Sequence, residues 1–510
     1  MRQHSRMLSD ISGCSNTAPP GVTSIGFGIR APDHARVLLM LDYPSDETLC
    51  AMSAAELMSA FARGEISPLD ATNATLKRIE RLNPDRNVFI TVSREVAMSA
   101  AAESEARWQR GRARSLEGLP FSVKDLVNTA GVRTTMGSQL FADNVPDTDA
   151  VAIARLREAG AVLLGKTTTP EFGHKPFTDA PLFGRTANAW SAEHTCGGSS
   201  GGAAAAVMLG MGPLAVATDG GGSTRIPAAC NGAVGIKPTA GVIAHSQTPD
   251  PFGNYTYVTP MTRTVRDTRL MMAAMAGPHA SDPWSYVAPQ SFAEAPPAGL
   301  DGLRIGVVTY LGNAQVAASV HTALANACAA LQGCGAYLTS LDVDIEPLEP
   351  LWHVINHATW RARFGDMVRD HGARMTDTLV KQVESASDYT AVDFQQASFA
   401  RGALFRRVQT WFHDCDIIMM PTLTRSAVSI DDNLFDGLDI DGTHYDEIRS
   451  AWYPYTMPFN LTGHPAISVP VAAYGEPLPL AVQLVGQFHE DARMLDVAEL
   501  LEEKLASMQG

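Results

Sequence analysis

The chain has 510 residues, of which 45% are hydrophobic and 18% charged, and its formal net charge is -15. A chain of this size buries a large core, and its acidity disfavours a nucleic-acid backbone or an anionic membrane as main partner. No apolar run approaches the ~20 residues that span a bilayer. Seven cysteines without close metal-ligand spacing favour reduced thiols, a cytoplasmic location and no metal site.

Residues 1–48 differ in character from the rest of the chain. They contain Pro19-Pro20-Gly21 and little periodicity, so we predict a leader that is disordered or that precedes the natural start. We predict a single domain over residues 49–510. Ser53-Ala-Ala-Glu56 has the capping-box pattern and predicts an amphipathic helix that ends near Gly64. Further helices are expected at Pro68–Leu82 and Arg94–Gly111.

The segment Gly118–Asp125, GLPFSVKD, opens the predicted sheet near Leu119 and places a lysine after a short apolar run. Burial disfavours the charged form of a lysine, whose ordinary pKa is ~10.4. A hydrogen bond to a serine such as Ser199 would favour the neutral form further. Lys124 is therefore a candidate general base.

Gly160–Thr167 fits the phosphate-loop pattern G-x-x-x-x-G-K-[ST]. Such a loop must follow a strand, but a helix-like segment, Val151–Ala159, precedes this one, and AVLL within it is strand-like. Pro170 also prevents a long following helix. We predict a helix, a turn and a buried strand ending at Lys166, and keep a P-loop nucleotide-binding protein as the less favoured alternative.

Two glycine-rich turns follow, and each contains a serine. Ser199 lies in Gly197–Gly202, which leads into the helix-forming run Ala203–Met208. Ser223 lies directly after three consecutive glycines, which follow the strand-like run Leu214–Thr218. Consecutive glycines let successive N–H groups converge on one point, as an oxyanion hole requires.

The remaining elements continue the alternation of strands and helices. Strand-like runs lie at Phe121–Val123, Val162–Leu164, Val234–Ile236, Leu303–Val308, Ala336–Val343, Cys415–Met420, Ala466–Val471 and Leu480–Val485. Helices are expected at Val316–Gln332 and Asp491–Leu505. This pattern predicts an α/β fold in which helices cover both faces of a mixed central sheet.

Four blocks, GLPFSVKD, GGSSGGAAAAV, TDGGGSTRIPAACNGAVGIKPT and PFNLTGHPAISVP, resemble the amidase signature family of serine hydrolases. The resemblance runs from about Ser53 to Leu501 and implies the amidase-signature fold and a Ser–cis-Ser–Lys triad. Position by position, Ser223 matches the nucleophile, Ser199 the bridging serine after a cis peptide, and Lys124 the base.

The resemblance also implies which groups support the triad. Gly220, Gly221, Gly222 and Ser223 match the oxyanion hole, and the supporting residues are Ser200, Asp219 and Arg225. Asp219 and Arg225 match a flanking charged pair whose role is structural. The resemblance implies neither a cofactor nor a metal.

One departure bears on function. Ile226 stands where the amidotransferase A-type subunits of this family, which need a partner and ATP, usually have glutamine. This residue disfavours the amidotransferase, which stays as an alternative to an amidase that works alone, as a monomer or a homodimer.

The substrate is the least determined feature. The segments expected to line the pockets as variable loops are His245–Pro260, Leu351–Ala397 and Thr424–Pro458. Their aromatic residues are Phe252, Tyr255, Tyr257, Trp352, Trp360, Phe364, Trp452, Tyr453 and Tyr455. As a group they favour a small molecule with a bulky apolar or aryl part, either an amide, an anilide or a carbamate, with an esterase side activity.

Overall fold

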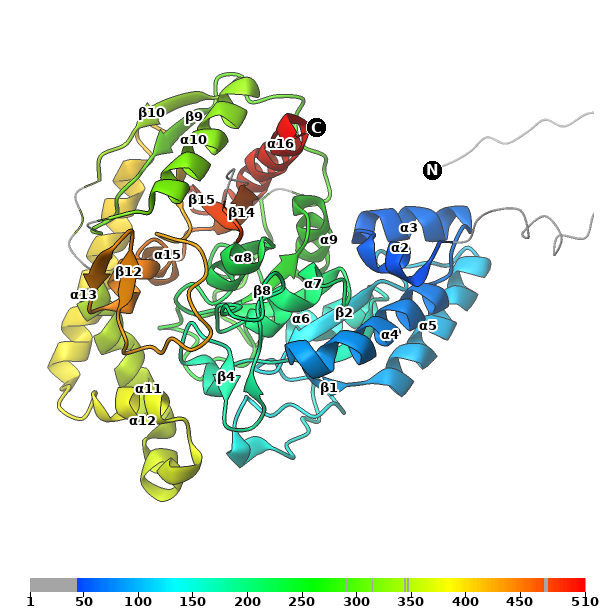
Figure 1. Cartoon of the computed structure of the whole chain (residues 1–510), viewed down its shortest axis with the longest axis horizontal. Coiled ribbons are helices and arrows are strands. Elements are labelled where there is room, and N and C mark those ends of the chain that lie inside the picture. Colours follow the sequence, from blue (N-terminus) through cyan, green and yellow to red (C-terminus); the bar gives the residue numbers. More distant parts are fainter. Residues whose placement is uncertain are drawn as a thin grey trace, which may run out of the picture. The chain divides into compact units, whose positions relative to one another are not determined.

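An 11-stranded sheet runs through the chain in the order β1-β3-β2-β6-β8-β7-β14-β15-β11-β9-β10 (Figure 1). The structure is a computed structural model that describes residues 44–289, 291–313, 315–343, 345, 348–471 and 476–509. The sheet strands are β1 Phe89–Val92, β2 Pro120–Lys124, β3 Val162–Thr167, β6 Leu214–Asp219, β7 Val234–Lys237, β8 Tyr257–Thr262, β9 Arg304–Val307, β10 Tyr337–Ser340, β11 Ile417–Pro421, β14 Ala466–Val471 and β15 Leu480–Gly486.

The sheet is mixed. Strand β2 is parallel to β3 and β6, and β9 is parallel to β10 and β11. The strands between these two groups, from β6 to β15, pair antiparallel with one another. The predicted α/β class with a mixed central sheet is confirmed.

Helices cover both faces of the sheet. Every residue of β2, β3 and β15 is buried, and successive side chains of a strand point to opposite faces, so neither face of these strands is open to solvent. The α-helices are α2 Asp46–Ala51, α3 Ala54–Arg63, α4 Pro68–Arg86, α5 Arg94–Gln109, α6 Val151–Glu158, α7 Gly201–Met208, α8 Arg225–Asn231, α9 Val265–Met275, α10 Ala318–Gly333, α11 Glu349–His371, α12 Asp377–Glu384, α13 Ala391–Trp411, α14 Ile448–Trp452, α15 Met457–Thr462 and α16 Asp491–Gln509.

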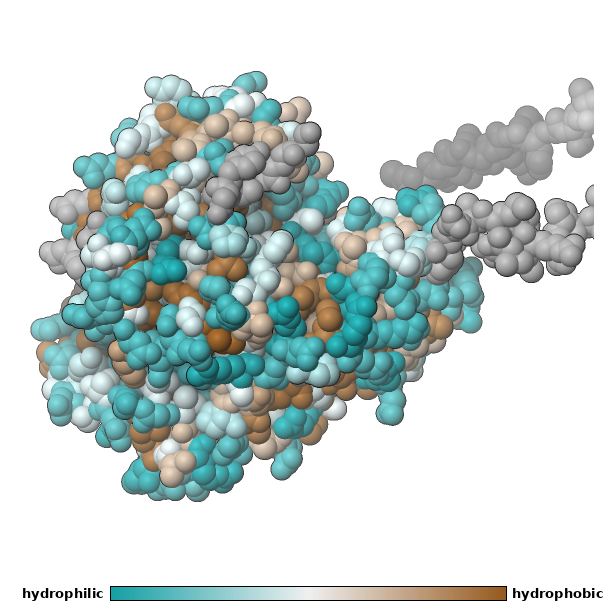
Figure 2. Space-filling view, in the orientation of Figure 1, coloured by the Kyte–Doolittle hydropathy of each residue, from teal (hydrophilic) through white to brown (hydrophobic). Residues whose placement is uncertain are grey.

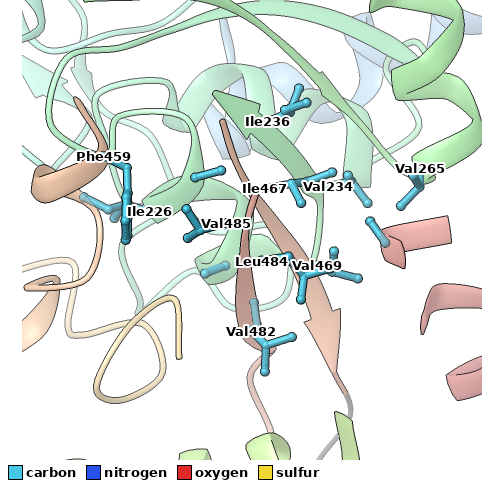
Figure 3. Close-up of a cluster of buried hydrophobic side chains, with 14 of the residues drawn as sticks. Ile226, Val234, Ile236, Val265, Phe459, Ile467, Val469, Val482, Leu484 and Val485 are labelled. Carbon is cyan, nitrogen blue, oxygen red and sulfur yellow. The ribbon is translucent and has the colours of Figure 1, made fainter. Parts of the chain in front are cut away.

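One part of the hydrophobic core lies where α8 and α15 approach the middle of the sheet. Figure 3 shows Ile467, Leu484 and Val485, buried side chains of β14 and β15, with Ile226 and Phe459 on the side of Val485. Each of these side chains is at most 2% exposed. The face seen in Figure 2 is largely hydrophilic, with apolar side chains in smaller separate patches. Among the described residues, no helix combines the length and the apolar character needed to cross a membrane.

The predicted leader, residues 1–48, is described only at its end. Residues 1–43, most of the predicted leader, lie outside the described residues. Helix α2 begins at Asp46, two residues before the predicted end of the leader, and the residues from Pro44 onward form one compact unit. The capping box is as expected: the Ser53 hydroxyl accepts from the Glu56 amide, and Gly64 ends α3 in the left-handed conformation.

Two elements differ from the sequence predictions. The end of the expected variable loop His245–Pro260 belongs to strand β8, which lies between β6 and β7 although it contains Pro260, a residue usually confined to edge strands. The segment Leu351–Ala397, expected as a variable loop, consists mainly of α11, α12 and the start of α13. These helices lie between β10 and β11 in the chain, although both strands pair with β9.

Candidate active site

The serine-rich turns lie at the carboxyl ends of two parallel strands. Lys124 is the last residue of β2, and Asp219 is the last residue of the neighbouring β6. Helix α7 starts two residues after Ser199, and α8 starts two residues after Ser223. The ends of adjacent parallel strands are a common location for ligand sites, because the connecting loops meet there.

Lys124 contacts both serines of the first turn. Its Nζ lies 2.8 Å from Ser199 Oγ, 2.8 Å from Ser200 Oγ and 2.9 Å from Thr218 Oγ1. The Lys124 side chain is completely buried, and no carboxylate of the described chain forms an ion pair with it. Burial therefore lowers the pKa of Lys124 well below the usual 10.5, and the negative charge of Asp219 opposes this only in part.

The turn around Ser199 is fixed by close backbone contacts. The Gly198–Ser199 peptide bond is cis, as the family resemblance implied. A side chain at Gly198 would approach the Phe177 nitrogen to 2.7 Å, and one at Gly202 would approach the Thr168 nitrogen to 2.6 Å. Only glycine fits at these two positions, which lets the turn pack closely against the neighbouring backbone.

Ser223 lies in the same cavity as Ser199. The Ser200 N–H donates to the Ser223 carbonyl over 3.0 Å, which ties the two turns together. Ser199 is 1% exposed, whereas Ser223 is half-buried and lines the cavity with it. Within the described residues the Ser223 hydroxyl makes no hydrogen bond, so it is available to a ligand.

The expected oxyanion hole differs at one residue. Gly220, Gly221 and Ser223 line the cavity, and the described chain offers no acceptor to their N–H groups. Gly222 does not line it, because its N–H donates to Asp219 Oδ1 over 2.7 Å. The expectation that all three glycines direct an N–H into the site is therefore corrected for Gly222.

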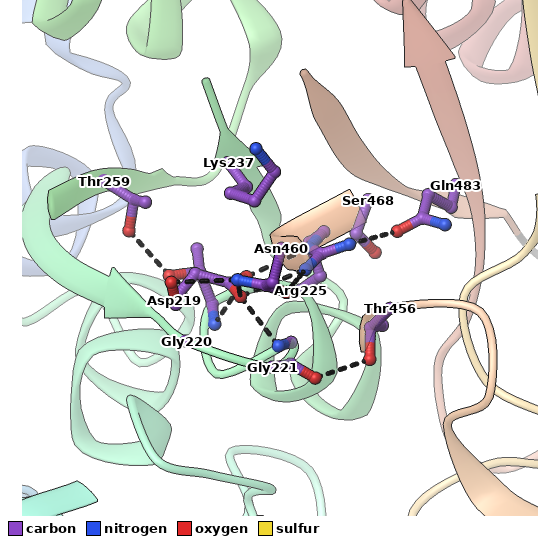
Figure 4. A network of polar contacts seen from close by, with 12 residues as sticks. Asp219, Gly220, Gly221, Arg225, Lys237, Thr259, Thr456, Asn460, Ser468 and Gln483 are labelled. Atoms are coloured by element: carbon purple, nitrogen blue, oxygen red, sulfur yellow. Dashed lines mark hydrogen bonds and ion pairs between the residues drawn. The ribbon is translucent and has the colours of Figure 1, made fainter. Parts of the chain in front are cut away.

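Asp219 and Arg225 form the buried support of this loop (Figure 4). Arg225 Nε lies 3.0 Å from Asp219 Oδ2, and Arg225 also donates to the amide oxygens of Asn460 and Gln483. Burial alone would raise the pKa of the Asp219 carboxyl, but the Arg225 guanidinium and the hydrogen bonds to it hold that pKa below its usual range. This pair holds the loop without reaching the cavity, consistent with the structural role expected for it.

The cavity has a volume of about 230 Å³. All three segments expected to line pockets contribute to its wall, the middle one as helix. Of the nine aromatic residues singled out, those that line it are Tyr255, Trp352, Trp360 and Tyr453. Ile226 lines it as well, and so do two arginines, Arg363 and Arg449.

The phosphate-loop pattern does not form a phosphate loop. Val162–Thr167 is strand β3, preceded by helix α6. Lys166 is completely buried; its Nζ donates to the Val127 carbonyl, to Thr129 Oγ1 at 2.9 Å and to Thr134 Oγ1 at 3.1 Å. These contacts fill the place that a phosphate would need.

Several contacts of the site were not predicted, although the sequence predicted Trp352 among the pocket aromatics and placed Thr456 in a pocket-lining segment. Thr218 contacts Lys124, Thr456 donates to the Gly221 carbonyl over 2.8 Å, and Trp352 Nε1 lies 3.5 Å from the Gly220 carbonyl. Thr218 directly precedes Asp219 at the end of β6, so its place at a strand end was an available signal. Trp352 and Thr456 come from distant segments, and no local pattern linked them to the loop.

Comparisons with known proteins show the family of this chain. The model of the Amidase family matches residues 70–495. The chain is 35% identical to an acylamidase of Rhodococcus erythropolis over 89% of this chain and 95% of that protein. It is 33% identical to the A-type subunit of glutamyl-tRNA(Gln) amidotransferase from Thermus thermophilus, over 89% of this chain and 98% of that protein. The structure of a bacterial aryl acylamidase of the amidase signature family matches with a TM-score of 0.82 and 27% identity, over 90% of this chain and 97% of that one.

Proposed function

The chain belongs to the amidase signature family, and we propose that it is a serine amidohydrolase that forms an acyl-enzyme on Ser223. The observation that carries this proposal is the 2.8 Å contact between Lys124 Nζ and Ser199 Oγ in a cavity that Ser223 also lines. Burial without a carboxylate partner favours the neutral form of a lysine, and the neutral form can accept a proton.

In the first step, Ser223 Oγ attacks the carbonyl carbon of the amide. The proton of Ser223 passes to Ser199 Oγ, while the proton of Ser199 passes to Lys124 Nζ. The C–O bond forms as the carbonyl π electrons move to the oxygen, and the N–H groups of Gly220, Gly221 and Ser223 stabilise that oxyanion. Each such donor lowers the barrier by ~3–4 kcal/mol.

In the second step, the C–N bond breaks and the proton held by Lys124 returns through Ser199 to the leaving nitrogen. The amine departs and leaves an ester on Ser223. A water molecule then attacks this ester, and its proton follows the same route to Lys124. Collapse of the second intermediate returns that proton to Ser223 Oγ and releases the acid, so the cycle needs neither a metal nor a nucleotide.

The proposed substrate is a small molecule with a bulky apolar or aryl part. Aromatic side chains from three segments line the cavity, and Ile226 adds an apolar surface beside the loop that carries Ser223. The relatives include an acylamidase and an aryl acylamidase. An anilide fits these features best, with carbamates and esters as further candidates.

The second candidate is an amidotransferase A-type subunit, because one of the similar proteins has that description. Proteins of this type depend on a partner and ATP. The apolar Ile226 in the cavity wall disfavours this candidate, since the family resemblance associates a glutamine at this position with the amidotransferases.

One experiment separates the two candidates. The purified chain is assayed without ATP or partner against para-nitroanilides, primary amides, carbamates and esters, and a fluorophosphonate-treated sample is mapped by mass spectrometry. We expect turnover of an anilide and a label on Ser223. Inertness toward the whole panel, or a label on Ser199 or Ser200 with Ser223 unmodified, would contradict the proposal.

We further propose that the enzyme works in the cytoplasm as a monomer or a homodimer. The six cysteines of the described chain are free thiols, which fits a reducing compartment. Size-exclusion chromatography with light scattering measures the oligomeric state, and a larger assembly would contradict this part.

A further inference from the structure

Arg449 is a buried cation in the wall of the active-site cavity. It lies on α14, its residue is 5% exposed, and it lines the cavity together with Ser199 and Ser223. The family resemblance assigned no role to this residue, and the proposed reaction does not use it.

The partners of Arg449 are neutral. One terminal nitrogen donates to His353 Nε2 over 3.2 Å and the other to the Gln382 amide oxygen over 2.5 Å, and the Tyr453 hydroxyl also accepts from it. Burial, reinforced by the Arg449 charge, lowers the pKa of His353 to about 4, so His353 is neutral when it accepts.

No carboxylate of the described chain pairs with Arg449. Glu349 is attracted to Arg449 over a longer distance without pairing with it, and its carboxylate lies 3.5 Å from His353 Nε2. A buried charge without a counterion is costly, and proteins usually compensate it with a paired ion. Because Glu349 compensates the charge of Arg449 only from a distance, that charge favours an anion that enters from the cavity.

The cation is close to the reacting groups. The Arg449 guanidinium carbon lies 5.3 Å from the centre of the Trp352 ring, and Trp352 Nε1 contacts the Gly220 carbonyl of the oxyanion loop. One aromatic ring thus separates Arg449 from the loop. A guanidinium carries five donors in a planar fork, and this geometry matches a carboxylate.

We propose that Arg449 binds a carboxylate of the substrate, which makes the preferred substrate an amide that carries an anionic group beside its apolar or aryl part. This inference rests on the proposed amidase function. Arg363 also lines the cavity, but it is exposed and lies over the Phe364 ring at 4.9 Å. Arg363 is the matched control, because it is an arginine of the same cavity whose residue is exposed, whereas Arg449 is buried.

The test uses two pairs of substrates of similar shape. On the acyl side, the mono-para-nitroanilide of succinate is compared with the para-nitroanilide of isocaproate. On the amine side, N-acetyl-para-aminobenzoate is compared with N-acetyl-para-isopropylaniline. The readout is the ratio of kcat/KM between the charged and the neutral member, which cancels any general loss of activity.

We expect the wild-type enzyme to prefer the carboxylate in one pair by roughly 10- to 100-fold, the value of a charge-assisted hydrogen-bond pair. Arg449→Gln should bring that ratio close to one, Arg449→Lys should retain part of it, and Arg363→Gln should retain all of it. Circular dichroism and thermal melting establish that each variant is folded.

Two results would overturn the proposal. One is a wild-type ratio of one or less in both pairs, which needs no variant and so is independent of how Arg449→Gln folds. The other is loss of the preference in Arg363→Gln but not in Arg449→Gln. Hydrolysis of the neutral members alone would support the amidase function even when this inference fails.

Discussion

Lys124 and Lys166 lie near the ends of adjacent parallel strands, and burial acts on both in the same direction. In the register of β2 and β3, Lys166 pairs with Val123 and Lys124 pairs with Thr167. The two lysines are therefore offset by one residue, and their side chains point to opposite faces of the sheet. Lys124 forms hydrogen bonds with serines at the cavity. Lys166 instead forms hydrogen bonds with a backbone carbonyl and threonine hydroxyls of the buried loop that follows β2.

This difference separates the effect of burial, which lowers the pKa of both lysines, from the effect of position, which decides the contacts of each. Burial lowers the pKa of Lys166 to about 7 and acts in the same direction on Lys124. A lowered pKa is thus common to both and does not identify a catalytic base by itself. The face of the sheet decides which lysine lies within hydrogen-bonding distance of the serines.

The largest expected effect is at Lys124. Lys124→Met should lower kcat by roughly 10²- to 10⁴-fold, because the proton acceptor of the serine pair is lost while the volume of the side chain is kept. Turnover of an anilide measures this, with circular dichroism as the check on folding. Near wild-type turnover would remove Lys124 from the mechanism and end the contrast between the two lysines.

The pH dependence of the rate should also separate them. Only neutral Lys124 accepts a proton, so kcat/KM should fall tenfold per unit as the pH drops below the pKa of Lys124, and should level off above it. Because burial lowers that pKa, this limb should lie well below pH 10.5. The same limb should persist in Lys166→Met. Loss of this acid limb of the pH–rate profile in Lys166→Met would show that Lys166, and not Lys124, is the titrating group.

Lys166→Met should change stability rather than turnover. It leaves the Val127 carbonyl and two threonine hydroxyls without their donor, at a cost of about 1–3 kcal/mol. The folded pKa of about 7 is below the unfolded value. The wild type should therefore gain stability over the variant as the pH rises from about 7 toward the unfolded pKa. Denaturant melts at several pH values measure this, and a pH-independent difference would contradict it.

The smallest expected effect is that of metals and nucleotides. The proton transfers proposed for Lys124 stay within the protein, so chelators should leave the rate unchanged. Lys166 has no free donor for a phosphate, so ATP should give no thermal shift, whereas a ligand at 100 times its Kd adds ~2.7 kcal/mol. A magnesium-dependent shift with ATP that Lys166→Met abolishes would revive the phosphate-loop alternative.

The sequence predicted which candidate residues the fold brings together better than it predicted the walls of the cavity. Lys124, Ser199 and Ser223 each lie in a local pattern of a strand end or a glycine turn, and the fold places both serines in one cavity with Lys124 in contact with Ser199. Arg449 lies in no such pattern, because its place depends on packing between distant helices. Pro260 in a central strand and the Gly222 N–H that binds Asp219 likewise depend on tertiary contacts that override local preference.

The helical segment between β10 and β11 is a connection that the pairing of the sheet strands does not require. Strand β9 pairs directly with both β10 and β11. The backbone hydrogen bonds of these strands therefore do not depend on residues 349–411, which connect β10 to β11. Mutation, insertion or exchange within that connection can alter Trp352 and its neighbours without rebuilding the ends of β2 and β6. Changes within that segment can therefore alter part of the cavity wall, including Trp352 and Trp360, while Ile226 and Arg449 stay as they are.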